Sequence, residues 1–140
     1  MQINIETGVE SIDVTRNGEI VGQIKFSTSD PALLRRLREV QMKADELMKT
    51  SKLDSNDDLD AQLDEADRLD KEMRALLDWA FGAPVADVVF GDSYCFTTSG
   101  GVTGMEQFLA GVTPGIEAAF KREVKAAEEH RMKYLEKYKK

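Results

Sequence analysis

The chain is poor in the residues that build disulfide frameworks and metal centres. It has one cysteine, Cys95, and one histidine, His130, among 140 residues. A single thiol cannot form an intramolecular disulfide, and one cysteine with one histidine cannot build a His-rich metal site. This usage excludes a disulfide-stapled secreted scaffold and favours a reducing intracellular compartment.

Long apolar runs are also lacking. The longest extend over a few residues, far short of the roughly 20 that a membrane-spanning helix needs. The first six residues contain neither a basic run nor an apolar signal core, so a standard signal peptide is not expected. We therefore expect no membrane partner and a cytoplasmic location.

What the chain does have is abundant charge on an ordinary apolar background. Hydrophobic residues make up 41%, charged residues 32%, and the net charge is −7. A chain of this size and composition is expected to form a single folded domain, 1–140, that buries about two-thirds of its unfolded surface. The charge is uneven, because residues 121–140 carry eight basic and four acidic side chains, which leaves +4 there and −11 before them. Such polarity favours head-to-tail self-association or a partner of complementary charge, although two solvated helix faces would show it too.

Two apolar stripes at helical spacing dominate the centre of the chain. They predict an antiparallel helix pair over about 31–50 and 56–81. Asp30 before Pro31 is typical of a helix start, and Gly82 of a helix end. The stripes comprise Leu33, Leu37, Val40, Ala44 and Leu47, and then Leu59, Leu63, Ala66, Leu69, Met73, Leu76 and Ala80.

The N-terminal region, residues 1–28, has strand chemistry. Asn17-Gly18 suits a two-residue turn, and β-branched residues flank it, which predicts strands near 9–16 and 19–27. Ile3 and Ile5 alternate with polar residues, a pattern that suggests an earlier strand paired with these two. The expected fold class is α+β: a hairpin or small sheet, then a mostly helical body that contains the antiparallel helix pair (29–82). Short helices, a Ser/Thr/Gly loop and a long C-terminal helix follow (83–140).

The region 83–140 begins with a short turn ending at Gly91 and a Ser/Thr/Gly-rich loop from Asp92 to Gly104. A short helix is expected to break near Gly111, and Thr113 with Pro114 to start a long last helix. The final third of that helix has more charge than apolar surface, so its end is expected to protrude until a partner covers it. The candidate partner contacts at this end are Tyr134, Leu135 and Tyr138.

No catalytic residues or cofactor are expected. Cys95 and His130 could be imagined as nucleophile and base, but Cys95 lies between two aromatic residues as a buried hydrophobe would. The stretch 98–104 lacks the Lys-Ser/Thr ending of a phosphate-binding loop. The C-terminal lysines and arginines are diluted by glutamates, so no nucleic-acid partner is expected either.

The nearest approach to a metal motif is residues 54–65, which place oxygen-bearing side chains at positions 1, 3, 5, 7, 9 and 12 of a calcium loop. Position 6 should be glycine so that the loop can turn sharply, and here it is Leu59. Leu59 also begins the second apolar stripe. This stretch therefore predicts a solvated acidic helix start and no metal site.

The order of these features resembles the tail assembly chaperones of long-tailed, siphovirus-type phages or prophages of Gram-positive hosts. The resemblance is carried by a hairpin leading into a helix at Ser29-Asp30-Pro31, a charged helix pair, and two Phe-Gly steps, Trp79-Ala80-Phe81-Gly82 and Val88-Val89-Phe90-Gly91. Further helical segments at 105–109 and 116–120 are similar too. The lysine-rich C-terminal helix and the loop at 97–104 depart from the family pattern.

The resemblance implies a non-enzymatic protein that coats the helical tape measure protein in the host cytoplasm until tail-tube subunits polymerise around it. Further partners that it suggests are the tail-tube protein and other copies of the chain, as a homo-oligomer. In this family a longer product often arises by ribosomal frameshifting. The alternatives are a structural phage component, such as a head–tail connector or tail-terminator protein, and a general helical adaptor protein.

Overall fold

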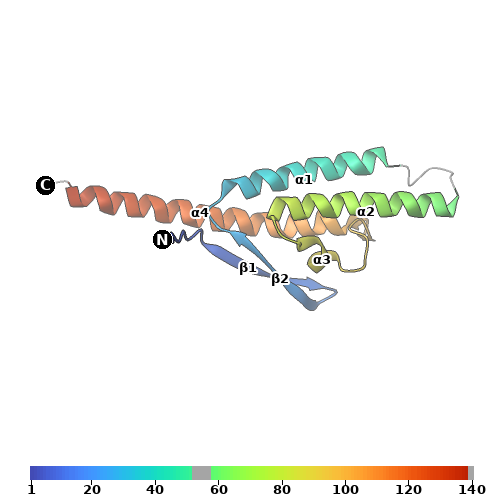
Figure 1. The fold of residues 1–140 in the computed structure, drawn as a ribbon, viewed down its shortest axis with the longest axis horizontal. Coiled ribbons are helices and arrows are strands. Elements are labelled where there is room, and N and C mark those ends of the chain that lie inside the picture. The colour runs from blue at the N-terminus through green and yellow to red at the C-terminus, as the bar shows by residue number, and fades with distance from the viewer. Residues whose placement is uncertain (52–57, 139–140) are drawn as a thin grey trace.

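A computed structural model describes residues 1–51 and 58–138 (Figure 1). An antiparallel hairpin comes first, formed by β1 (Val9–Arg16) and β2 (Glu19–Ser27). Asn17 and Gly18 have φ angles of 51° and 84°, which are the left-handed angles that a tight Asn-Gly turn requires. The predicted strand bounds are confirmed.

The earlier strand suggested by Ile3 and Ile5 is wrong. Both side chains are exposed, at 80% and 77%, and residues 1–8 do not form a strand. Gly8 has a φ of +66°, and its carbonyl accepts hydrogen bonds from the backbone N–H (2.9 Å) and hydroxyl (2.6 Å) of Thr28. Because a positive φ interrupts extended backbone, the ladder with β2 ends there.

The predicted antiparallel helix pair is present as α1 (Pro31–Thr50) and α2 (Leu59–Phe81) (Figure 1). Asp30 caps α1 by accepting a hydrogen bond from the backbone N–H two residues on, at 2.9 Å. Gly82 ends α2 with a φ of 66°, which suits a residue without a Cβ. The bounds of α1 match the prediction, whereas the expected start of the second helix at residue 56 lies outside the described residues.

The two apolar stripes are buried unequally. Four residues of the first are buried, but Leu59 and Leu63 in the second are 69% and 47% exposed. Figure 1 shows the reason, since the first turns of α2 extend past the end of α1. The prediction also chose the wrong one of two adjacent leucines. It assigned Leu76 to the core, whereas Leu77 is fully buried and Leu76 is only partly buried.

The expected short turn before Gly91 is in fact a six-residue helix, α3 (Val85–Phe90). Its first turn is stabilised from a distance, because Asp78 of α2 accepts a hydrogen bond from the Ala86 N–H at 2.8 Å. That carboxylate supplies a cap that the residue preceding the helix, Pro84, cannot provide. The sequence around α3 contains no local cap, which is why a turn was predicted.

The segment predicted as a Ser/Thr/Gly-rich loop contains regular secondary structure. It contains a second small hairpin, β3 (Thr98–Ser99) with β4 (Val102–Thr103). Gly100 and Gly101 make the turn with φ angles of 58° and 83°. Glycine is needed at both positions because other residues rarely adopt such angles.

One continuous helix, α4 (Gly104–Tyr138), completes the chain. The break predicted near Gly111 is wrong, and Thr113 and Pro114 lie inside the helix. Proline lacks the N–H that would bond the Ala110 carbonyl, but Ala110 is exposed, so water can satisfy that group. The buried face runs through the expected break and holds the helix together; it comprises Met105, Leu109, Val112, Ile116 and Ala119.

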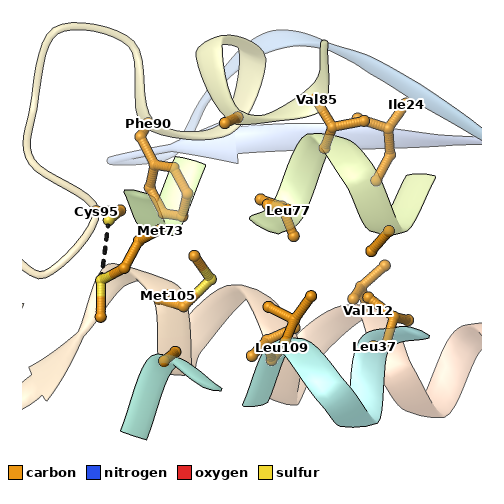
Figure 2. Close-up of a cluster of buried hydrophobic side chains, with 14 of the residues drawn as sticks. Ile24, Leu37, Met73, Leu77, Val85, Phe90, Cys95, Met105, Leu109 and Val112 are labelled. Atoms are coloured by element: carbon orange, nitrogen blue, oxygen red, sulfur yellow. Dashed lines mark hydrogen bonds between the residues drawn. The ribbon is translucent and has the colours of Figure 1, made fainter. Parts of the chain in front are cut away.

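The core has α2 at its centre. Figure 2 shows Met73 and Leu77 of α2 between two layers of side chains. On one side lie residues of β2 and α3, and on the other lie residues of α4 and α1. The labelled members are Ile24, Val85 and Phe90 in the first layer and Met105, Leu109, Val112 and Leu37 in the second. The fold is α+β, with an N-terminal hairpin, a helical body and a long C-terminal helix, as predicted.

Candidate partner-binding surfaces

The C-terminal half of α4 projects from the body (Figure 1). We call residues 121–138 the α4 tip. Each of them is exposed, including the three candidate contacts Tyr134 (57%), Leu135 (57%) and Tyr138 (73%). The rings of Tyr134 and Tyr138 lie together, with centroids 5.1 Å apart. The structure therefore gathers the candidate residues on one exposed segment.

The apolar residues of the α4 tip follow a coiled-coil spacing. Starting from Phe120, which directly precedes the tip, successive intervals of four and three residues lead to Val124, Ala127, Arg131, Tyr134 and Tyr138. Such a seam is what a helix presents to another helix. Arg131 is the one charged member, and the flanking positions are mostly charged, so the seam is narrow.

Glu10 of the hairpin and Thr28, which follows it, contact the start of the α4 tip. Arg122 Nη2 lies 3.1 Å from a carboxylate oxygen of Glu10 in β1, and Thr28 Oγ1 lies 3.5 Å from Glu123 Oε1. The tip extends about 26 Å at 1.5 Å per residue. A lone helix of this length is marginal in water, so covering its seam would stabilise it.

A groove lies between α1 and α4, and we call it the α1/α4 groove. It encloses about 990 Å³. Three methionines line it, Met48 from α1, Met73 from α2 and Met105 from α4. Charged side chains line it as well: Arg35, Arg38 and Asp45 from α1, and Glu106 and Glu117 from α4.

A second, smaller groove of about 560 Å³ lies on the outer side of the helix pair, between α1 and α2. Leu47, Leu76 and Trp79 line it. Trp79 is 48% exposed, and the Lys43 ammonium lies 5.6 Å from its ring centroid, a cation–π arrangement. The stripe pattern assigned Leu47 and Leu76 to the core, and it gave no sign that Trp79 would face a hollow.

The structure does not bring Cys95 and His130 together. Cys95 is fully buried, with Sγ 3.4 Å from Met73 Sδ, as predicted for a small hydrophobe. Burial raises the pKa of its thiol to about 12, so it is not a thiolate at neutral pH. The Cys95 carbonyl accepts a hydrogen bond from the N–H of Met105 at 2.8 Å, and His130 lies 25 residues further along α4, about 38 Å away.

The acidic start of α2 is a regular helix start. Asp58 caps the helix by accepting a hydrogen bond from the Ala61 N–H at 2.8 Å, and the helix runs on from Leu59. Positions 54–57 of the calcium-like pattern lie outside the described residues. Within 1–51 and 58–138, no group of three or more His, Cys, Asp and Glu side chains is arranged to hold a metal ion.

The backbone N–H groups at the start of α4, which follows the glycine-rich loop, already donate hydrogen bonds within the protein. The N–H of Gly104 donates to the Thr97 carbonyl at 2.9 Å, and the N–H of Met105 donates to Cys95. The next N–H, of Glu106, donates to the Thr103 hydroxyl at 3.1 Å. An anion would have to displace these bonds, so the geometry is that of a capped helix rather than a phosphate cradle.

Sequence reasoning missed Arg74, which fastens the loop after α3. Its guanidinium contacts the carboxylates of Asp70 (2.8 Å) and Asp87 (3.0 Å) and donates to the carbonyls of Gly91 (2.8 Å) and Ser93 (2.6 Å). A single arginine in a charged helix gives no local signal of such a role. Arg74 thus positions the chain that enters the small hairpin.

Comparison with models of known families, with curated protein sequences and with solved structures gives no match for this chain. Over the two described stretches, no helix combines the length and the apolar character needed to cross a bilayer. The surfaces described above are therefore the features on which a functional proposal can rest.

Proposed function

We propose that the chain is a tail assembly chaperone of a long-tailed phage or prophage of a Gram-positive host. In this role it is a non-enzymatic, cytoplasmic protein that binds the helical tape measure protein and keeps it soluble until tail-tube subunits polymerise. The proposal combines the family resemblance with one structural observation. That observation is the exposed apolar seam of the α4 tip.

The seam has the properties of a helix-binding surface. Tyr134 and Tyr138 offer large aromatic areas one turn apart, and Leu135 extends the patch. Aromatic anchors of this kind carry much of the binding energy in protein interfaces. A tape measure protein exposes long apolar helical stripes, which could pack against the seam.

The charge on the rest of the molecule suits the same role. The chain carries a net charge of −7, and the opposite face of the α4 tip includes Arg122, Glu129 and Glu136. A chaperone that covers an apolar stripe must present a charged outer surface, because otherwise the complex would aggregate.

Co-expression with a tape measure protein tests the proposal, and the protein to choose is the product of any long tape-measure reading frame found directly downstream of this gene. We expect the soluble fraction of that protein to rise and the two chains to co-purify. A Tyr134→Glu, Leu135→Glu variant should lose both effects, because it places two charges in the seam. The matched control, Glu129→Gln with Glu136→Gln, changes the opposite face and should retain them.

An unchanged solubility of the tape measure protein in the presence of the native chain would refute the proposal. Mass spectrometry of purified virions provides a second test. A chaperone leaves the assembly, so the chain should be absent from finished particles. Its presence there in stoichiometric amounts would point instead to a connector or tail-terminator protein.

A further inference from the structure

We propose that the α4 tip of one copy lies in the α1/α4 groove of a second copy, and the reverse, in a two-fold symmetric antiparallel dimer. This inference concerns the chain by itself and does not rest on the proposed function. Because both contacts use the α4 tip, the second copy occupies the seam when the tape measure protein is absent, and the tape measure protein would have to displace it. It rests on four observations: the length of the tip and groove, their positions along α4, the order of their charges, and the apolar side chains that would meet.

The lengths agree. The α1/α4 groove extends along α1 from Leu34 to Met48, about 21 Å at the helical rise. The α4 tip, residues 121–138, is about 26 Å long and is exposed throughout. One tip can therefore fill one groove along its length.

The positions along α4 permit a reciprocal arrangement. The groove is lined by the first half of α4, between Met105 and Glu117, and the tip is the second half of the same helix. The midpoint of α4 (Gly104–Tyr138) is residue 121. If two α4 helices lie antiparallel about a two-fold axis at residue 121, each tip lies beside the other copy's groove. Such an isologous contact closes on itself at two copies.

The charges match in this register. Figure 1 shows that α1 and α4 run in opposite directions, so Arg35 and Arg38 lie at the end of the groove near Pro114, and Asp45 lies at the end near Glu106. Residue 128 of the second copy would lie opposite residue 114, which brings Glu128 to the arginines. Glu117 lines the same end of the groove, and it would lie opposite Lys125. Residue 137 would lie opposite residue 105, which brings Lys137 to the acidic end. Opposite charges at both ends fix the direction of the incoming helix.

The apolar side chains match as well. In the same register Tyr134 and Tyr138 lie at the level of residues 108 and 104 along α4, next to the end of the groove that Met48 and Met105 line. Met48 is 37% exposed there, whereas Met73 and Met105 are buried beneath the groove. Methionine adapts its shape to an incoming side chain and makes favourable sulfur–aromatic contacts. The exposed tyrosines would therefore meet Met48, the accessible methionine at this end of the groove.

The first experiment measures the mass of the native chain by sedimentation and light scattering between about 1 and 100 µM. We expect a dimer, twice the chain mass of 15.7 kDa. A monomer throughout this range would overturn the proposal, and so would an assembly larger than a dimer, because reciprocal seating closes at two copies. The proposed function is tested separately, with the tape measure protein present. The variant that alters the groove alone, Ala110→Arg, distinguishes the two proposals, because it should abolish the dimer and leave binding of the tape measure protein to the α4 tip intact.

Two variants distinguish a dimer in which each α4 tip binds the other copy's groove from a dimer in which the two tips pair with each other. Ala110→Arg places a long charged side chain in the groove wall at an exposed position and should give a monomer. Tyr134→Glu with Leu135→Glu should also give a monomer. A dimer that survives Ala110→Arg would mean that the tips pair with each other, and it would overturn the proposal. The control, Glu129→Gln with Glu136→Gln, should remain dimeric, and circular dichroism should show native helicity in all variants.

A charge swap tests the register. Arg38→Glu and Glu128→Arg should each weaken the dimer about tenfold, because each places like charges together. Combining them in one chain should restore the dissociation constant to within about threefold of the native value. The effects of the two single changes on the dissociation constant multiply if the residues do not interact. A double variant whose dimer is weakened by that product would show that the two residues do not meet and that the proposed register is wrong.

Discussion

Replacing Gly111 and Gly115 by alanine should stabilise the protein. The two residues lie one turn apart inside α4. A Cβ built at either position meets no atom within 4 Å. Glycine inside a helix costs about 0.5–1 kcal/mol relative to alanine, because it loses more backbone freedom on folding.

The double variant should therefore gain about 1–2 kcal/mol in the free energy of unfolding. With an unfolding entropy of about 2.1 cal/mol/K per residue, a chain of 140 residues has about 0.29 kcal/mol/K at its midpoint. The gain corresponds to a rise in Tm of about 3–7 °C. Thermal unfolding followed by circular dichroism at low protein concentration measures it without a contribution from self-association.

This experiment also tests whether α4 is continuous in solution. If the helix broke at Gly111 and restarted at Thr113, alanine at Gly111 would be neutral or destabilising. Thr113→Ala would then cost about 1 kcal/mol as a lost helix cap, whereas inside a continuous helix it should be neutral or stabilise by up to about 0.7 kcal/mol, because alanine is the better helix former. An unchanged or lowered Tm for the glycine variants, with a clear loss for Thr113→Ala, would refute the continuous helix.

Three further outcomes are expected. Leu77→Ala should lower the free energy of unfolding by about 3–4 kcal/mol in a urea titration, because Leu77 is fully buried at the centre of the core. Gly91→Ala should be destabilising by more than about 1 kcal/mol in the same titration, since Gly91 has a φ of +57° and its added Cβ would lie 2.6 Å from Arg16 Nη1. Cys95 should make stability fall as pH rises, since burial raises its thiol pKa from 9.0 to about 12 and between these values the unfolded chain loses a proton that the folded chain keeps. Cys95→Ala should lack that part of the slope when the two proteins are unfolded in urea at pH 8 and pH 10.

Local chemistry was enough to predict the N-terminal hairpin and α1. The Asn17-Gly18 turn sets the hairpin, and Asp30 with Pro31 sets the start of α1, because each signal depends on neighbouring residues alone. α3 was missed since its cap comes from Asp78 in another element. The continuity of α4 was missed for a similar reason, because burial of its apolar face outweighs the weak helix formers Gly111 and Pro114.

The misplaced core position in α2 has a related cause. A single stripe describes a helix buried on one side, but α2 has neighbours on two sides (Figure 2). Its buried surface is therefore broader than one stripe and includes Leu77 as well as Met73. Which of two adjacent leucines is deeper depends on the hairpin and α3, and these are remote in sequence.

Of the candidate surfaces, one could be predicted from the sequence and one could not. The exposed α4 tip could be predicted, because its sequence contains more charge than a buried helix tolerates. The α1/α4 groove could not, since its walls come from segments about 70 residues apart, Leu34–Met48 and Met105–Glu117. Groove shape depends on how two helices pack, and the apolar pattern of each helix alone does not determine it.

The half-exposed position of Trp79 gives the protein a built-in optical reporter. Trp79 is the single tryptophan of the chain, and it lies beside Lys43 on the outer side of the helix pair. Its emission should therefore be that of a partly hydrated indole even in the native protein. A ligand bound over this indole should shift the emission to shorter wavelength, whereas dimer formation through the α1/α4 groove should leave the spectrum unchanged. Fluorescence can thus tell which groove is occupied without any added label.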